Sequence, residues 1–102
     1  MIQETVTLTR PSSDIPWHWF VVNRSNFAVH VEQNYILTEK MLTQYEENPD
    51  ELTSIWIKFW DSEASIKEFH ADPEVQIYRK ACNDYNKFVG ITMSDSVLTE
   101  AE

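Results

Sequence analysis

The sequence contains a single glycine, Gly90, among its 102 residues. Loops that cradle phosphate groups need several glycines, because these residues let the backbone approach the ligand closely. Neither the Walker-type loop nor the dinucleotide-binding fingerprint is therefore present. We expect no nucleotide cofactor bound in either of these two ways.

Cysteine is equally scarce, since Cys82 is the only one in the chain. An intrachain disulfide and a multi-cysteine metal site are both excluded, and a chain without disulfides fits the reducing cytoplasm. The three histidines, His18, His30 and His70, lie on separate predicted elements and lack the spacing typical of zinc ligands. We expect no metal and no other cofactor, and we interpret Cys82 as a small apolar core residue rather than a nucleophile.

Basic residues are also few. Eight Lys and Arg stand against seventeen Asp and Glu, which gives a formal net charge of −9. Such a surface repels the phosphates of nucleic acids and anionic membrane surfaces. No stretch approaches the roughly 20 apolar residues of a membrane span, and Met1–Arg10 lacks the apolar run of a signal peptide. We expect neither nucleic acid nor a membrane as partner, and a cytoplasmic location.

Tryptophan, in contrast, is abundant. Four tryptophans occur in a chain whose length predicts one domain, residues 1–102, with a modest core. Their large side chains need a core, a pocket or an interface in which to be buried.

The spacing of apolar residues predicts first a strand and then a helix. Residues 2–9 alternate between apolar and polar, as in a strand with one buried face. Residues 17–22 form a short extended or irregular stretch that is rich in aromatics. Apolar residues then recur every four positions over 26–37, which indicates a helix.

Two strands around a turn are predicted next. Residues 38–47 could prolong the helix or form a strand, and we favour the strand because a turn signal at 47–50 leads into a clear strand at 52–60. Both faces of the later strand are apolar, with Trp56 and Trp60 on one of them. A sheet with helices on one side only should be polar on its other side. We therefore predict a homodimer formed through the sheet faces, with both tryptophans at or near the interface.

The last third of the chain is predicted to be a bent helix followed by a strand. Asp61 or Ser62 caps a helix that restarts with Asp72 as N-cap and stops at Gly90. Residues 91–98 form the last strand, after which we expect the chain to fray. The order of elements is the α+β, ferredoxin-like β-α-β-β-α-β arrangement with an antiparallel sheet.

Two sets of residues carry a resemblance to known proteins. Residues 59–64 (FWDSEA) and 72–76 (DPEVQ) resemble the strand-to-helix segment of dimeric α+β barrel proteins. This superfamily includes antibiotic-biosynthesis-type monooxygenases and haem-degrading monooxygenases. Residues 7–11 and 85–91 look more like small uncharacterised marine microbial and phage proteins of the same fold. The resemblance implies a dimeric α+β barrel.

The resemblance also bears on activity. Haem-degrading members carry a tryptophan early in the second helix and a histidine further along it. Phe69 stands at the first place in this chain, and Tyr78 or Arg79 lies near the second, so the haem-degrading pattern is broken. Cofactor-free members use Asn, Trp, Tyr and Arg around an apolar cavity. The resemblance thus implies a cofactor-independent monooxygenase or isomerase, acting on an aromatic or quinone-like substrate, as one alternative.

The aromatic residues themselves suggest a binding protein. An aromatic-lined cavity between sheet and helices would accept an apolar or amphipathic small molecule such as a fatty acid. The candidate lining residues are Trp17, His18, Trp19, Tyr35, Trp56, Trp60, Phe69 and Tyr78. The cations that could balance an anionic head group are Arg10, Arg24, Lys58 and Arg79.

A third reading is a structural or accessory protein, such as a phage-encoded one, whose aromatics only build the dimer. The interior distinguishes the three readings. A fully packed interior favours the structural protein, and a dead-end cavity favours the binding protein. A cavity with an open mouth, a base and a polar anchor favours the enzyme.

Overall fold

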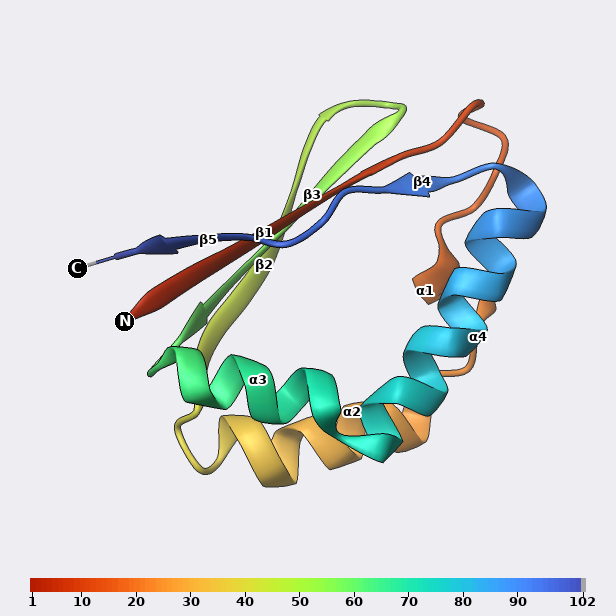
Figure 1. Cartoon of the computed structure of the whole chain (residues 1–102). Coiled ribbons are helices and arrows are strands. Elements are labelled where there is room, and N and C mark those ends of the chain that lie inside the picture. Colours follow the sequence, from red (N-terminus) through yellow and green to blue (C-terminus); the bar gives the residue numbers. More distant parts are fainter. Residues whose placement is uncertain (102) are drawn as a thin grey trace.

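The computed structural model describes residues 1–101 and has an antiparallel sheet with helices packed on one side of it (Figure 1). The sheet has five strands in the order β2-β3-β1-β4, and β5 also pairs with β1. The strands are β1 (Ile2–Thr9), β2 (Met41–Asp50), β3 (Thr53–Trp60), β4 (Thr92–Met93) and β5 (Val97–Glu100). This topology confirms the ferredoxin-like α+β fold that the sequence predicts.

The helices follow the sequence signals closely. They are α1 (His18–Val21), α2 (Ser25–Val31) with its π-helical extension η1 (Glu32–Ile36), α3 (Glu63–Ala71) and α4 (Pro73–Val89). The Asp72 side chain accepts a hydrogen bond from the Glu74 amide at the start of α4. Gly90 ends the helix with φ 85°, a left-handed conformation that favours glycine.

Three local predictions need adjustment. The ambiguous segment 38–47 is a strand, as favoured, but it begins at residue 41 and continues to 50. The aromatic stretch that was predicted to be extended or irregular contains the short helix α1. The last strand is divided in two and stays paired to residue 100 instead of fraying. It divides where the Ser94 hydroxyl, instead of a backbone carbonyl, accepts the hydrogen bond of the Thr7 amide at 2.9 Å.

The face of β3 that carries Trp56 and Trp60 packs against the helices, not against a second sheet as predicted. Trp60 is fully buried and its ring lies against Tyr35 and Phe69, which come from the helical side. Trp56 shares that inner face and lies against Trp19 of α1. The prediction that both tryptophans lie at a dimer interface is therefore wrong. The alternation shows which residues share a face, but when both faces are apolar it does not show which face meets the helices.

The core consists of two apolar clusters on this inner face. The first lies beneath α2, α3 and the start of α4, and its buried members are Val31, Tyr35, Met41, Trp60, Ile66, Phe69 and Val75. The second lies near α1 and the end of α4, with Leu8, Trp17 and Ile91 at its centre. The space between the two clusters is where the candidate site lies.

No helix within residues 1–101 is both long enough and apolar enough to cross a membrane. The cytoplasmic location stays a prediction that rests on the single cysteine. The expected absence of nucleic acid and membrane partners likewise stays a prediction that rests on the net charge.

Candidate functional site

A cavity of about 590 Å³ lies between the inner face of the sheet and the helices. Residues from β1, β3, α1, α3 and α4 line it, together with the segment 93–98. Its volume is within the range of roughly 300–1,000 Å³ found for small-molecule sites. The interior is therefore not fully packed, which removes the main support for a purely structural protein.

Five of the eight residues that the sequence nominates line this cavity. They are His18, Trp19, Trp56, Phe69 and Tyr78. They come from four different elements, so the fold brings together side chains that are far apart in the chain. Whether they contact a ligand stays a prediction.

The other three nominated residues are buried in the core instead. Trp17 stacks on Trp19 with ring centroids 5.4 Å apart and belongs to the second cluster. The Tyr35 hydroxyl donates to the Asp72 carboxylate at 2.6 Å, and burial followed by this bond raises the pKa of Tyr35. The indole N–H of Trp60 donates a hydrogen bond to the Glu4 carboxylate. None of the three lines the cavity.

Aromatic rings form one wall of the cavity. The Trp19 and Trp56 rings meet edge to face with centroids 5.1 Å apart, and the His18 ring lies 4.9 Å from Trp19. The short helix α1 positions His18 and Trp19, and the Tyr85 hydroxyl of α4 donates to the Pro16 carbonyl just before that helix. This wall offers π surface to a flat apolar molecule.

Unpartnered polar atoms gather at the same end of the cavity. Within residues 1–101, the buried side-chain nitrogen and oxygen atoms without a hydrogen bond belong to His18 (Nδ1), Trp56 (Nε1) and Asn86 (Nδ2 and Oδ1). All three residues line the cavity. Each unpaired buried polar group costs about 1–3 kcal/mol of stability. We call these three residues the polar group of the cavity.

The polar group offers both donors and acceptors. The Trp56 indole can only donate, while the Asn86 amide, which is 4% exposed, can donate and accept. Burial lowers the pKa of His18, and the nearby Arg24 charge lowers it further, while the Asn86 side chain, which lies close enough to interact with the ring, opposes this shift; the ring is neutral at pH 7. A neutral ring has one nitrogen that accepts and one that donates. The set is suited to an oxygen atom on a bound molecule.

A chain of charged hydrogen bonds lies further along the cavity. Glu4, which is 2% exposed, accepts from Trp60 Nε1 at 3.2 Å and from His70 Nε2 at 2.8 Å. On its other side, the His70 ring accepts at Nδ1 from the Arg79 guanidinium. Because arginine can only donate, Nδ1 of His70 is the acceptor in this bond.

The charge of Glu4 is firmly held in this position. Burial raises the pKa of the carboxyl group, but the His70 hydrogen bond and the charge of Lys58 outweigh that effect and lower the pKa to about 2. Glu4 and Lys58 are cross-strand partners in β1 and β3. The carboxylate is therefore ionised throughout the physiological range.

The residues that hold a metal in proteins do not gather here. Within residues 1–101, no group of three or more His, Cys, Asp or Glu side chains is placed to bind an ion. The absence of metal and cofactor stays a prediction, as it was from the sequence. Burial raises the pKa of Cys82, so its thiol is not activated as a nucleophile.

Solved structures similar to this chain share its fold. SnoaB, a cofactor-independent oxygenase from Streptomyces nogalater, matches in its asparagine-to-alanine variant with a TM-score of 0.64 and 14% identity, over 98% of this chain and 91% of that one. A proposed antibiotic biosynthesis monooxygenase from Deinococcus radiodurans matches with a TM-score of 0.61 and 18% identity, over 100% and 93%. A dimeric ferredoxin-like protein from an uncultured marine organism matches with a TM-score of 0.59 and 10% identity, over 99% of this chain and 96% of that one.

These likenesses confirm the suspected resemblance at the level of the fold. The chain shares the ferredoxin-like fold of these proteins, which include a cofactor-independent oxygenase and a proposed antibiotic biosynthesis monooxygenase. No model of a protein family matches the chain, and no curated protein matches it either. At these identities, function does not follow from the fold.

Proposed function

We propose that the chain binds an apolar or amphipathic small molecule in the aromatic-lined cavity, with an oxygen atom of that molecule at the polar group. The observation that carries the proposal is the location of the unpartnered buried polar atoms: within residues 1–101, each belongs to a residue that lines this one cavity. Native proteins pair nearly all such atoms. A bound carbonyl oxygen would accept from the N–H groups of Trp56 and Asn86, and a bound hydroxyl group could in addition donate to His18 or to the Asn86 oxygen.

The aromatic wall supports a flat ligand over a flexible chain. The edge-to-face pair of Trp19 and Trp56 gives the cavity extended π surfaces. Such surfaces favour offset or edge contacts with another ring. An aromatic or quinone-like molecule therefore fits better than the fatty acid considered from sequence alone.

Matched ligands test this proposal. Tryptophan fluorescence of the wild type is titrated with 9-fluorenone and with fluorene, which differ by the carbonyl oxygen. We expect saturable binding of the ketone, about tenfold tighter than that of the hydrocarbon, as one buried hydrogen bond supplies. Asn86→Leu should remove this preference, while Asn26→Leu, at an exposed helical position, should keep it. No saturable change with any member of a wider panel of aromatic ketones and phenols would refute the proposal.

A second candidate is a cofactor-independent oxygenase. Its specific support is His18, a half-buried, neutral cavity-lining residue whose unpaired Nδ1 could accept a proton from an acidic O–H or C–H group of a substrate once the ring turns toward it. The deprotonated substrate would then react with dioxygen. An oxygen electrode with a polyhydroxylated aromatic substrate tests this. Uptake should depend on wild-type protein and be lost in His18→Gln, and uptake that persists unchanged in the variant would exclude His18 as the base.

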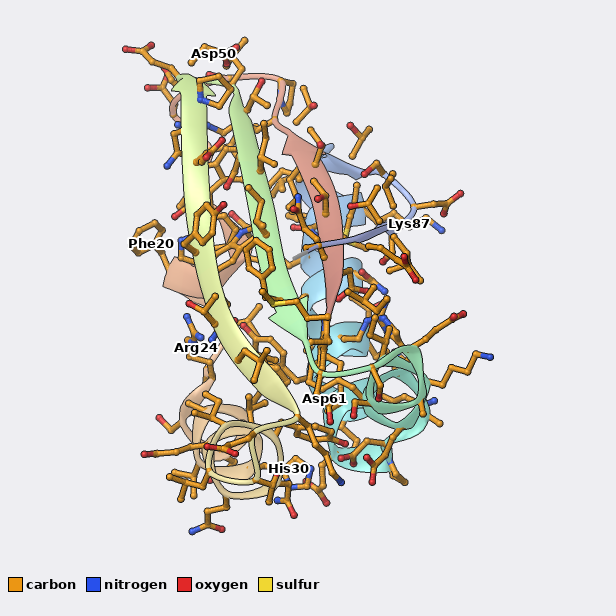
Figure 2. All side chains as sticks on the ribbon, turned by 90° about the vertical axis from the view of Figure 1, so that its left-hand side faces the viewer. Phe20, Arg24, His30, Asp50, Asp61 and Lys87 are labelled. Carbon is orange, nitrogen blue, oxygen red and sulfur yellow. The ribbon has the colours of Figure 1, made fainter. Side chains whose placement is uncertain are left out.

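The outer face of the sheet supports the homodimer. Ile55, Ile57 and Phe59 of β3 point away from the helices, and the Tyr45 ring of β2 stacks on Phe59. In Figure 2 this face is turned toward the viewer; α1 and α4 lie behind the strands, α2 and α3 lie at their lower end, and no helix of residues 1–101 covers the face. Ile57 is already buried, Ile55 and Phe59 are half-buried, and Tyr45 is 43% exposed. We propose that a second copy of the chain covers this face, because apolar sheet surface that stays accessible favours association.

Light scattering measures this directly. The wild type should show twice the chain mass at micromolar concentration, and Phe59→Lys should shift the protein to one chain mass, because a charge cannot be buried between two apolar faces. Val29→Lys, at an exposed position of α2, is the control and should remain dimeric. A monomeric wild type would contradict the proposal.

A further inference from the structure

The charges of the molecule are distributed unevenly. The cavity lining contains four of the eight Lys and Arg residues but only three of the seventeen Asp and Glu residues. The cations are Arg24, Lys58, Lys67 and Arg79, and the anions are Glu4, Glu63 and Asp95. A strongly acidic protein thus encloses a cavity whose own lining has a net positive charge.

Neighbouring groups account for only part of this charge. Lys67 lies 3.9 Å from Glu63 one helical turn away. Glu4 is already engaged by His70 and Trp60. Among the described residues, Lys58 makes no hydrogen bond or ion pair, and its ammonium group lies over the Phe69 ring, 4.8 Å from the centroid. Lys58 is therefore a cation that faces the cavity without an acceptor.

Arg79 is the second cation of this region and is held in place. Its guanidinium donates to His70, which in turn is fixed by Glu4. The guanidinium keeps further N–H donors that this bond does not use. Burial lowers the pKa of Lys58, the negative charge of Glu4 raises it, and the positive charge of Arg79 lowers it again, so Lys58 and Arg79 are close enough to affect each other.

We infer that an anionic group, a carboxylate in the first instance, binds between Lys58 and Arg79. The inference rests on the proposed function and names its ligand class: a flat aromatic acid with a second oxygen at its far end. Trp56 and Lys58 are two positions apart on the same strand face, which separates them by roughly 7 Å. The carboxylate and the distal oxygen would thus be at opposite ends of a body about two fused rings long.

The Glu4–His70–Arg79 chain explains how a carboxylate could be preferred there. A buried acidic side chain beside two cations would normally neutralise one of them by direct contact. Here the carboxylate of Glu4 instead accepts a hydrogen bond from the His70 ring, and that ring in turn accepts a hydrogen bond from the Arg79 guanidinium and holds it in place. Both cations remain available to an incoming anion, and charge-assisted hydrogen bonds from arginine to carboxylate are among the stronger ones in proteins.

A matched acid and ester separate this inference from the proposed function. Isothermal titration calorimetry at pH 7 compares 6-hydroxy-2-naphthoic acid with its methyl ester, which keeps the rings and the distal hydroxyl but lacks the charge. We expect the acid to bind about 10- to 100-fold more tightly to the wild type. Lys58→Met and Arg79→Met should each lose most of that preference and leave ester binding within about twofold. Lys80→Met, which removes an exposed charge next to Arg79 on α4, is the control and should keep the preference.

The outcomes differ for the two ideas. Equal binding of acid and ester by the wild type would overturn the anion site and leave the proposed function standing. Binding of neither compound, nor of the neutral aromatic ketones, would overturn both. Since the acid-to-ester ratio is measured on the wild type, the inference is decided even if one of the variants does not fold.

Discussion

Replacing Glu4 by Gln tests the energetic role of the buried carboxylate. The pKa of this group falls from an ordinary value near 4.5 to about 2 in the folded protein. A depressed folded-state pKa stabilises the native state at pH values above 4.5, and that stabilisation is lost as the pH falls toward 2. The shift corresponds to about 3 kcal/mol at pH 7 and to about 1.4 kcal/mol at pH 3. Glu4→Gln removes the charge, so it should lower the free energy of unfolding by about 3 kcal/mol at pH 7.

Urea denaturation followed by tryptophan fluorescence measures this effect at pH 7 and at pH 3. The difference between wild type and Glu4→Gln should shrink by about half between the two pH values, because the wild type loses at low pH what the variant lacks at every pH. Glu47→Gln makes the same exchange at an exposed strand position and should stay within about 0.5 kcal/mol of the wild type. A loss of less than about 1 kcal/mol in Glu4→Gln at pH 7, or a difference that is the same at both pH values, would refute the electrostatic argument.

Three further outcomes follow from single contacts. Asp72→Ala removes the N-cap of α4 and the acceptor of the buried Tyr35 hydroxyl, so it should lower the free energy of unfolding in urea by about 2–3 kcal/mol, and a loss below about 0.5 kcal/mol would speak against both roles. Gly90→Ala places a Cβ at φ 85° and should cost about 1 kcal/mol, whereas an unchanged urea midpoint would mean that the turn relaxes. Cys82 should react with Ellman's reagent at pH 8 at least about tenfold more slowly in the native protein than in urea, since burial raises its pKa and limits access, and equal rates would show that the thiol is exposed.

The elements of this fold could be predicted because their signals are local. Asp72 is the N-cap of α4 and Gly90 its C-cap, and such caps depend only on a few neighbouring residues. The alternation of β3 also showed which of its residues share a face, but it did not show which face turns toward the helices. Trp56 and Trp60 turn toward the helices because these provide the larger apolar partners, and this choice depends on elements distant in the sequence.

The site could be predicted only in part for a similar reason. Large aromatic residues such as Trp19 and Trp56 attract attention by type, but the Glu4–His70–Arg79 chain exists only because β1, α3 and α4 converge. A readable signal was nevertheless present. Glu4 occupies an inward position of an alternating strand, between two apolar residues of the same face. An acidic residue at such a position indicates a partner elsewhere in the fold.

Asn86 carries a similar signal and shows why the polar lining points to function. It stands one helical turn after Cys82 on the buried stripe of α4, where an apolar residue would pack without cost. Both polar ends of its side chain are unpartnered. A small domain has only about 5–15 kcal/mol of net stability, of which unpaired groups at about 1–3 kcal/mol each consume a large share. An apolar residue in place of Asn86 would remove this cost, so Asn86→Leu should raise the free energy of unfolding of the ligand-free protein even as it weakens the binding of the proposed ligand.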